Sequence, residues 1–425
     1  MDNYSLKEKE NIMGMLIPAI IMGRVSEFFG FFVYAIASVL VFPIVFFPNA
    51  DPINALLMSF AVFSLAFIAR PIGSVLFIML DKIIGRSGKI ILALLLLGVS
   101  TICIGFLPSY AEIGIAAPIA LAILRFGQGL ATGGSFSGLI SAVARNAPKE
   151  RRGWYSMFAQ LGAPIGLILA LVFFAVFKSI LTAEEFINWG WRFTFIVVLA
   201  LNVVSLFARM KLTNTEELQE IRKSMHLKPV PILDLFRKYG YWVWVGAYVP
   251  LASFALFHMV TVFPLGLVML GDVMPLADFL IIEIVGAVIF ATFVFISGLL
   301  ADKIGREQLL LIAATLIALF SLFTGVIIQD DYSGITVFVL VGFAILGLSY
   351  GQTRGALAHH FDDVYRYTGA MVTSDIAWLF GAAFAPIIAF ALTHYYGVQY
   401  AGYYLLSGAL ATIVALLLSR KKVKR

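Results

Sequence analysis

Eight ionisable side chains occur inside stretches of sequence that are otherwise apolar, and these side chains are the candidates for chemistry. They are Arg24, Glu27, Arg70, Arg125, His258, Glu283, Arg354 and Asp375. A charged side chain is costly to place in a hydrocarbon environment, so residues of this kind are usually paired with one another or used in function. The sequence therefore predicts ion pairs, solute ligands or proton carriers at these positions.

Arg24 and Glu27 are the leading candidates for binding a solute. Their spacing of three residues puts them on one face of a helix, where the two charges can partly neutralise one another. The alternative is a static ion pair that only fixes helix packing. Arg125 carries a planar guanidinium fork that suits a carboxylate or a phosphate, so we expect an anionic solute. The alternative for Arg125 is a salt bridge to Glu27.

Three carboxylates are candidates for carrying protons. A carboxylate in an apolar cavity can gain or lose a proton when its access changes from one side of a membrane to the other. Glu27 and Asp375 fit this role best, and Glu283 is a further candidate. The alternatives are a packing or helix-terminal role for Asp375 and a position near the outer end of its helix for Glu283.

Arg354 and His258 complete the set of candidate solute ligands. Arg354 could bind an anion or could extend toward the membrane surface. His258 titrates near neutral pH, but a lone histidine on an apolar helix is more often a hydrogen-bonded structural residue. His359 and His360 lie close to two aspartates, yet clusters of this kind at loop edges are usually solvated. We therefore expect no metal site, and nothing in the sequence calls for a cofactor.

The elements that carry these side chains must be membrane-spanning helices. Hydrophobic residues make up 61% of the 425 residues and charged residues only 13%, which is too apolar for a protein that covers itself in water. Runs long enough to cross a hydrocarbon core recur along the chain, and the alternating pattern of a β-barrel is absent. The sequence predicts an all-α membrane protein with twelve spans. The expected spans are residues 12–47, 53–80, 89–109, 112–144, 154–178, 188–209, 239–270, 276–300, 308–328, 333–359, 368–394 and 398–419.

The placement of lysine and arginine predicts the orientation of these spans. Acids such as Asp51, Glu112 and Asp331 lie in the loops after odd-numbered spans, with Lys178 as the basic exception. Basic residues follow spans 2, 4 and 8, at Lys82, Arg86, Lys89, Arg145, Lys149, Arg151, Arg152, Lys303 and Arg306. Because basic loops stay inside, we expect a multi-pass protein of the inner membrane with both termini in the cytoplasm.

An internal repeat divides the chain. MLDKIIGR (79–86) ends span 2 and LLADKIGR (299–306) ends span 8, so the same charged turn recurs at the same place in each half. Two halves related in this way are typical of transporters whose solute site lies between them near the membrane midplane. We expect an N-terminal six-helix bundle at 1–210, a cytoplasmic linker at 211–238, and a C-terminal six-helix bundle with a short basic tail at 239–425.

Several other functions are excluded by the sequence. The single cysteine, Cys103, cannot form a disulfide within one chain. The net charge of +6 comes from basic residues in short loops beside anionic lipid, which does not indicate nucleic-acid binding. No His/Asp acceptor cluster, nucleophile elbow or metal motif is placed for catalysis at a membrane boundary, so we expect no enzyme activity. The expected partners are a small solute, protons and the lipid bilayer, for a chain that works as a monomer.

Seven segments together resemble the major facilitator superfamily, and more closely its metabolite:proton symporter branch of organic-acid, shikimate and osmolyte importers. The segments are GRVSEFFGFFVY (23–34), ARPIGSVLF (69–77), GFLPSYAEIGIAAP (105–118), LRFGQGLATGG (124–134), GWR (190–192), LADKIGR (300–306) and YRYTG (365–369). The resemblance implies two pseudo-symmetric six-helix bundles and import by proton-coupled alternating access. Arg125 matches an arginine typical of the family, and Tyr34 and Gln128 in the same segments join the expected solute site.

The resemblance also implies a set of gating residues. The charged turns hold the cytoplasmic ends of neighbouring helices together in the outward-open state of family members, and these contacts break on inward opening. The gating residues expected here are Asp81, Arg86, Asp302, Arg306 and Arg366.

This chain departs from the family pattern at charged positions. Arg24 stands where the family usually has Asn, and Gly30 and Ser135 stand where it usually has acids. The main hypothesis is proton-coupled import of a small anionic organic solute. The alternatives are a proton-independent facilitator or exchanger, an efflux carrier, and a solute sensor that does not transport.

Overall fold

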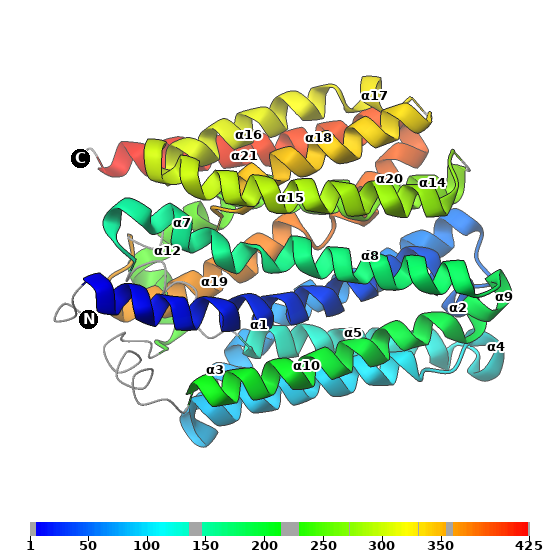
Figure 1. Cartoon of the computed structure of the whole chain (residues 1–425), viewed down its shortest axis with the longest axis horizontal. Coiled ribbons are helices and arrows are strands. Elements are labelled where there is room, and N and C mark those ends of the chain that lie inside the picture. Colours follow the sequence, from blue (N-terminus) through cyan, green and yellow to red (C-terminus); the bar gives the residue numbers. More distant parts are fainter. Residues whose placement is uncertain are drawn as a thin grey trace.

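The structure is a computed structural model, and it describes residues 6–135, 147–213, 229–271, 273–329, 331–353 and 360–423. Within these ranges the ordered elements are helices, and no strand occurs. The long helices run side by side along the long axis of the molecule, and the two ends of the chain lie at the same end of it (Figure 1). Both features agree with the all-α bundle expected from the sequence.

The helices before the central linker begin with α1, which carries Arg24 and Glu27. They are α1 (Leu6–Leu40), α2 (Phe42–Phe46), α3 (Pro52–Gly105), α4 (Tyr110–Ile113), α5 (Ala116–Gly134), α7 (Arg152–Met157), α8 (Gly162–Ile180), α9 (Ala183–Glu185) and α10 (Trp191–Thr213). Short 3-10 turns at Lys149–Arg151 and Phe158–Gln160 and a π turn at Phe186–Gly190 join some of them.

The helices after the linker include α13, α15 and α19, which carry His258, Glu283 and Asp375. They are α12 (Ile232–Tyr248), α13 (Leu251–Thr261), α14 (Phe263–Gly271), α15 (Leu276–Ile304), α16 (Arg306–Leu322), α17 (Thr324–Ile327), α18 (Tyr332–Tyr350), α19 (Asp363–Gly381), α20 (Ala385–Tyr396) and α21 (Val398–Val423). The expected linker 211–238 is shorter at both ends, since α10 runs to Thr213 and α12 begins at Ile232. Residues 214–228 lie outside the described part.

Ten helical segments of the described chain are long and apolar enough to cross a membrane. The helices α5 and α16 fall outside this set. The 19-residue α5 contains Arg125, Gln128 and several glycines, which lower its hydropathy, and α16 has 17 residues. With these two added, the twelve expected spans are all represented in the described ranges. The second and third spans form one element, α3, which is interrupted at Gly85.

The two charged turns share a backbone conformation. Gly85 has a φ of 70° and Gly305 a φ of 88°. Positive φ values strain residues with a Cβ, which explains why both repeats end in Gly-Arg. The chain changes direction at these glycines, so α3 folds back on itself and α15 leads into α16.

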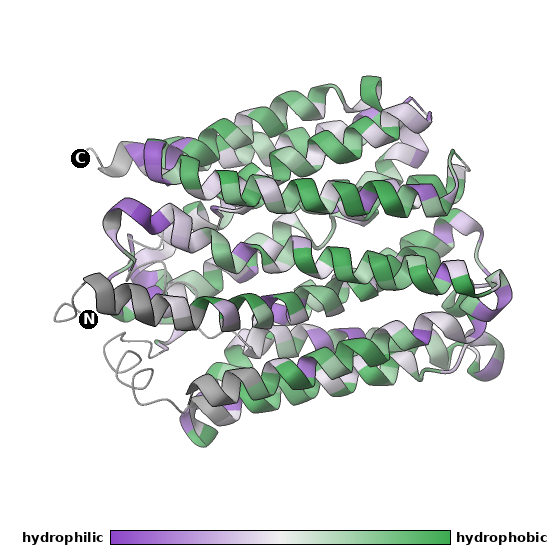
Figure 2. Ribbon diagram, in the orientation of Figure 1, coloured by the Kyte–Doolittle hydropathy of each residue, from purple (hydrophilic) through white to green (hydrophobic). Residues whose placement is uncertain are grey.

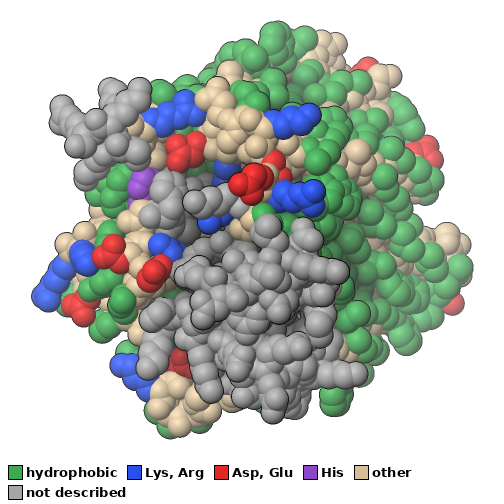
Figure 3. All heavy atoms as spheres, turned by 60° about the vertical axis from the view of Figure 1, so that its left-hand side comes forward, with side chains coloured by type: hydrophobic (Ala, Val, Ile, Leu, Met, Phe, Trp, Pro, Cys, Tyr) green, Lys and Arg blue, Asp and Glu red, His purple; other side chains and the backbone are tan. Residues whose placement is uncertain are grey.

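The lateral surface of the bundle is apolar, as a lipid-facing surface must be. Hydrophobic residues cover the middle of the helices and polar residues gather toward their ends (Figure 2). Lysine and arginine side chains lie around the end that carries the termini, while the neighbouring side of the molecule is almost entirely hydrophobic (Figure 3). Large apolar side chains such as Ile83, Phe106 and Val326 are more than half exposed on the surface of the molecule. An apolar patch of this size would be a liability in water.

Helices α1 to α10 pack mainly on one another, and helices α12 to α21 do the same. In the first group α3 packs on α5 and α1 packs on α8 and α10, while in the second α15 packs on α18 and α16 on α21. The two groups meet where α15 packs against α7 and α8, and where α19 and α20 pack against α3. The contact of α19 with α3 lies beside the site described next.

Two glycines bring the helices of the site close together. A Cβ added at Gly133 of α5 would collide with the carbonyl oxygen of Arg70 on α3, and one added at Gly162 of α8 would collide with the Cβ of Arg24 on α1. Small residues of this kind allow helix backbones to approach closely in membranes. The packing therefore fixes where the Arg24 and Arg70 side chains begin.

Candidate functional site

A cavity lies among α1, α3, α5 and α10, with Trp378 of α19 closing one wall. Its volume is about 70 Å³. This is room for several waters or one small organic molecule. The polar lining residues are Arg24, Ser26, Glu27, Arg70, Thr101, Arg125, Gln128, Thr132 and Asn202. The aromatic ones are Phe28, Phe31, Phe67 and Trp378. Trp378 is the sole lining residue from the helices after the linker, so the cavity belongs mostly to the first half of the described chain.

Arg24 and Glu27 form the ion pair that their spacing predicts, with Arg24 Nη1 2.6 Å from Glu27 Oε2. The guanidinium also lies 4.5 Å from the centre of the Phe28 ring. Arg24 is buried, whereas the Glu27 side chain keeps 22% of its surface accessible. The Nε and Nη2 atoms of Arg24 have no hydrogen-bond partner among the described residues. The pair therefore leaves two buried donor atoms of Arg24, a residue of the cavity lining, without an acceptor among the described residues.

Arg125 is held by neutral groups. Its Nε donates to the carbonyl of Phe63 at 3.2 Å and its Nη1 donates to Gln128 Oε1 at 2.9 Å, and Gln128 donates in turn to Thr101 at 2.8 Å. The guanidinium lies 3.8 Å from the centre of the Tyr34 ring. Its Nη2 has no partner within the described ranges. The alternative of a salt bridge from Arg125 to a carboxylate is therefore wrong, because its hydrogen bonds go to a carbonyl and an amide.

Tyr34 and Gln128 support Arg125 in different ways. Gln128 lines the cavity and anchors the guanidinium. Tyr34 does not line the cavity, and its buried hydroxyl has no hydrogen-bond partner in the described part of the chain. Its ring stacks behind the guanidinium, which is a cation–π contact. The structure thus places Tyr34 behind the arginine and away from the cavity space.

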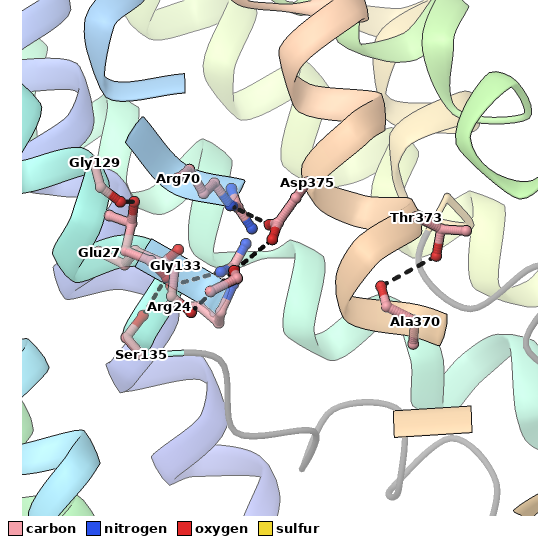
Figure 4. A network of polar contacts seen from close by, with 11 residues as sticks. Arg24, Glu27, Arg70, Gly129, Gly133, Ser135, Ala370, Thr373 and Asp375 are labelled. Atoms are coloured by element: carbon pink, nitrogen blue, oxygen red, sulfur yellow. Dashed lines mark hydrogen bonds and ion pairs between the residues drawn. The ribbon is translucent and has the colours of Figure 1, made fainter. Parts of the chain in front are cut away.

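Asp375 crosses from α19 to α3. Its Oδ1 accepts from Arg70 Nε at 2.8 Å and its Oδ2 accepts from Ser74 Oγ at 2.5 Å. Figure 4 shows Asp375 pointing toward Arg70 from the neighbouring helix. Arg70 lines the cavity and lies 5.8 Å from the Trp378 ring. The sequence marked Arg70 as an ionisable residue in an apolar run but gave no signal for its partner, which lies 305 residues away.

His258 and Glu283 are fully buried and lie outside the cavity lining. Neither ring nitrogen of His258 has a hydrogen-bond partner among the described residues. The rings of Phe31, Phe63 and Phe67 surround it at 5.4–5.9 Å between ring centres. His258 therefore lies apart from the cavity and makes no hydrogen bond among the described residues. Both carboxylate oxygens of Glu283 are also without partners in the described ranges, so Glu283 is a buried residue of α15 despite its position near the start of that helix.

The second charged turn joins the two groups of helices. Asp302 accepts from the backbone N–H of Gly153 at 2.6 Å and of Trp154 at 3.1 Å, at the start of α7. A carboxylate at a helix N-terminus is stabilised by the N–H groups that lack partners there. Arg306 donates to Ser156 on the same helix and to Gln352 Oε1 at 3.2 Å. Asp302 of α15 and Arg306 of α16 therefore both contact α7.

The first charged turn makes a different set of contacts. Asp81 Oδ1 is buried without a hydrogen-bond partner in the described part of the chain. Arg366 binds Asp363 and the carbonyl of Phe361 at the start of its own helix. The two turns are alike in sequence, but within the described ranges Asp81 Oδ1 does not repeat the contacts of Asp302. The side chain of Arg86 and all of Arg354 lie outside the described part, as does His359.

Some lining residues were not expected from the sequence. Asn202 accepts a hydrogen bond from Ser26 at 2.7 Å, and its Nδ2 has no partner among the described residues. An asparagine inside an apolar span is a signal that could have identified it. Phe67 and Trp378 stack at 6.0 Å and carry no such signal, because aromatic residues are common throughout the sequence. Within the described ranges, no group of three His, Cys, Asp or Glu side chains could hold a metal ion.

Comparison with known proteins places these features in a family. Residues 28–374 match the model of the Major Facilitator Superfamily. The chain is 37% identical over 417 residues to the inner membrane metabolite transport protein YhjE of Escherichia coli strain K12, covering 97% of this chain and 95% of that protein. It is 30% identical to the shikimate transporter of the same strain, covering 94% and 92%.

Solved structures share the fold. The crystal structure of a D-xylose-proton symporter superposes with a TM-score of 0.70 over 95% of this chain and 96% of that one, at 18% identity. A partially occluded inward-open structure of the xylose transporter XylE from E. coli gives a TM-score of 0.68 over 96% and 97%, at 17% identity. At these identities the likeness concerns the fold. The named relatives are transporters and not enzymes.

Proposed function

The chain belongs to the Major Facilitator Superfamily and is a multi-pass membrane transporter of metabolites, and we propose that it imports a small anionic organic solute together with protons. The solute binds in the cavity described above. Transport proceeds by alternating access, in which the two six-helix bundles rock about the site.

The unmet hydrogen-bond donors of the cavity carry this proposal. Nε and Nη2 of Arg24, Nη2 of Arg125 and Nδ2 of Asn202 are buried and have no partner among the described residues. Within the described ranges, no buried side-chain oxygen of a cavity-lining residue lacks a hydrogen-bond partner. A buried donor without an acceptor costs about 1–3 kcal/mol, and more when the donor is charged. The ligand that relieves this cost supplies acceptors, and a carboxylate or phosphate supplies several.

The charge balance favours an anion as well. Three arginines line the cavity, at positions 24, 70 and 125. Two carboxylates balance them, Glu27 within the cavity wall and Asp375 behind Arg70. The site therefore keeps an excess positive charge when both acids are ionised. The rings of Phe28, Phe31 and Phe67 leave room beside the arginines for the apolar body of an organic solute.

Proton coupling rests on the acids that touch these arginines. Glu27 is accessible from the cavity and is paired with Arg24. A proton on Glu27 releases Arg24 for an incoming anion and raises the positive charge of the site. We assign Glu27 as the first proton carrier for this reason. Glu283 makes no hydrogen bond to Arg24, Arg70 or Arg125, so we give it no part in this step.

We also propose that both termini face the cytoplasm and that one chain is sufficient for transport. Both ends of the described chain lie at one end of the molecule, where lysine and arginine gather, as expected for a cytoplasmic face. Protease cleavage of a C-terminal tag in membrane vesicles of known orientation tests the first point.

A ligand screen followed by transport measurements tests the function. We expect carboxylates or phosphorylated metabolites, and not cations, to raise the melting temperature of the purified protein, because a ligand stabilises the state that it binds. Uptake of the best ligand into proteoliposomes should rise with an inward proton gradient. Uptake that survives collapse of the gradient indicates a facilitator or exchanger. Tight binding without flux indicates a sensor, and stabilisation by cations alone contradicts the anion site.

A further inference from the structure

The contact of Asp375 with α3 joins the two groups of helices beside the solute cavity. Asp375 lies on α19 and accepts hydrogen bonds from Arg70 and Ser74, which are one helical turn apart on α3. The carboxylate and the guanidinium are both nearly buried, with 4% and 11% of their side-chain surfaces exposed. An ion pair in this position resists separation of α19 from α3 while both groups are charged.

Arg70 belongs to this ion pair and to the cavity wall at the same time. It lines the cavity, and Trp378, one turn beyond Asp375 on α19, lines it as well. The Trp378 ring stacks on Phe67 of α3, with ring centres 6.0 Å apart and planes 17° apart. The guanidinium of Arg70 lies near the same ring. An anion that enters the cavity therefore meets Arg70 at the point where α3 and α19 touch.

Ser74 provides a hydroxyl that can serve either state of Asp375. Its single O–H donates to Asp375 Oδ2 at 2.5 Å, and the carbonyl of Gly133 lies 3.4 Å away as a second acceptor. When Asp375 carries a proton, the Ser74 hydroxyl can turn to that carbonyl. The Ser74 hydroxyl therefore keeps an acceptor when Asp375 is neutral.

We propose that Arg70 is a third anion ligand of the transporter and that Asp375 is the proton acceptor that releases it. One proton binds a carboxylate oxygen of Asp375, the ion pair with Arg70 separates, and the guanidinium pairs with the carboxylate or phosphate of the solute. No covalent bond changes, and one proton enters for each negative charge that Arg70 takes up. This inference rests on the proposed function for the identity of the solute. The ion pair between Asp375 and Arg70, called the latch below, can open without the solute.

The other charged groups near Asp375 allow this exchange. On α1, Arg24 and Glu27 neutralise one another in the wall of the cavity. On α5, Arg125 is held by Gln128. On α13, which packs on α19, His258 lies inside a cage of aromatic rings. Further along α3, Lys89 donates to Tyr367 at 3.3 Å, two turns from Asp375 on α19. Arg70 is in direct contact with Asp375, 2.8 Å from its Oδ1.

Distance measurements between spin labels test the latch without any solute. Cysteines replace Ile83 on α3 and Leu233 on α12, which are 78% and 61% exposed, in a chain that carries Cys103→Ser. The full-length protein is studied in nanodiscs by double electron–electron resonance from pH 8 to pH 5. We expect a second, longer distance population to appear as the pH falls. A distribution that does not depend on pH overturns the proposal.

Three variants identify the groups responsible. Asp375→Asn should show the longer population at every pH, because a neutral amide cannot hold the ion pair. Ser74→Ala removes one hydrogen bond to the charged form, so the transition should move to higher pH by about one unit. Asp278→Asn, the same type of change at an acid in the first turn of α15, should behave as the unsubstituted chain does. An Asp375→Asn variant that keeps the pH dependence refutes the latch.

The latch and the proposed function fail in different ways. If the label distances respond to pH through Asp375 but no anion binds, the latch stands and the solute assignment is wrong. If an anion is taken up with protons while the distances ignore Asp375, the transport function stands and the latch is wrong. Arg70→Lys then checks the ligand role, since it should weaken anion binding and leave the charge of the site unchanged.

Discussion

Replacement of Arg125 by glutamine is the sharpest test of the anion site. Arg125 is buried, and its Nε and Nη1 are used by Phe63 and Gln128. Its Nη2 is the atom left for a ligand within the described structure. Glutamine keeps a polar group near Gln128 but removes the charge and the donor fork. We expect the substitution to weaken anion binding strongly and to leave the fold intact.

The size of the effect follows from the contacts. A hydrogen bond to a charged group contributes about 1.5–3 kcal/mol. Because about 1.4 kcal/mol is a factor of ten in affinity, Arg125→Gln should raise Kd by roughly 10- to 150-fold. Arg125→Lys keeps the charge but cannot bind the carbonyl of Phe63, the amide of Gln128 and the ligand at once. We expect it to fall near the lower end of this range. The loss of stability should be small, because removing a buried charge also removes its desolvation cost.

Isothermal titration calorimetry and thermal unfolding of the purified variants separate these effects. Arg192→Lys is the matched control, since Arg192 also donates to backbone carbonyls, those of Gly105 at 3.0 Å and Leu107 at 2.7 Å, but lies outside the cavity lining. This control should lose stability and keep its affinity for the anion. An Arg125→Gln variant with unchanged Kd would refute the assigned role.

Three further outcomes can be measured. Glu27→Gln should abolish the stimulation of uptake by a proton gradient while solute exchange at equal concentrations continues; gradient-driven uptake at the original rate would contradict this. Asp302→Asn weakens the acceptor of two backbone N–H groups of α7, so a cysteine at Met157, which packs against α15, should react several-fold faster with a maleimide. Asp51 caps α3, and hydrogen bonds from Asn54 lower the pKa of its carboxyl. Asp51→Ala should therefore lower the melting temperature at pH 7. The difference should shrink as the pH falls below about 4, where the carboxyl of the unfolded chain gains its proton, until the native carboxyl, whose pKa is lower, is protonated as well.

The sequence predicts most of the fold because the relevant signals are local. The thickness of a bilayer sets the length of the twelve apolar runs. An even number of spans places both ends of the chain on the same side, and the basic loops predict which side that is. Some helices continue beyond the apolar run, as α12 does by beginning at Ile232, seven residues before the expected start of its span, although its backbone departs from helical geometry at Tyr239. Hydropathy does not report where a helix ends in water, because polar residues form helices as well.

The candidate site divides along the same line. The Arg24–Glu27 pair could be predicted because residues three apart meet on any α-helix. The contact between Arg70 and Asp375 could not, since it depends on how α19 is placed against α3. The two charged turns make the limit plain. They share a sequence and a backbone conformation, yet Asp302 reaches the start of α7 and Asp81 Oδ1 has no partner within the described residues.

By itself, the sequence determined that this protein is a bundle of membrane-spanning helices and which few ionisable residues lie inside it, because hydrophobicity and helical spacing act over neighbouring residues. The tertiary structure decided which of those residues meet, which donors remain unmet in the cavity, and that His258 is enclosed by rings while Asp375 bridges two helices. Contacts of this kind depend on the packing of helices hundreds of residues apart, where a single glycine such as Gly133 sets the distance between backbones.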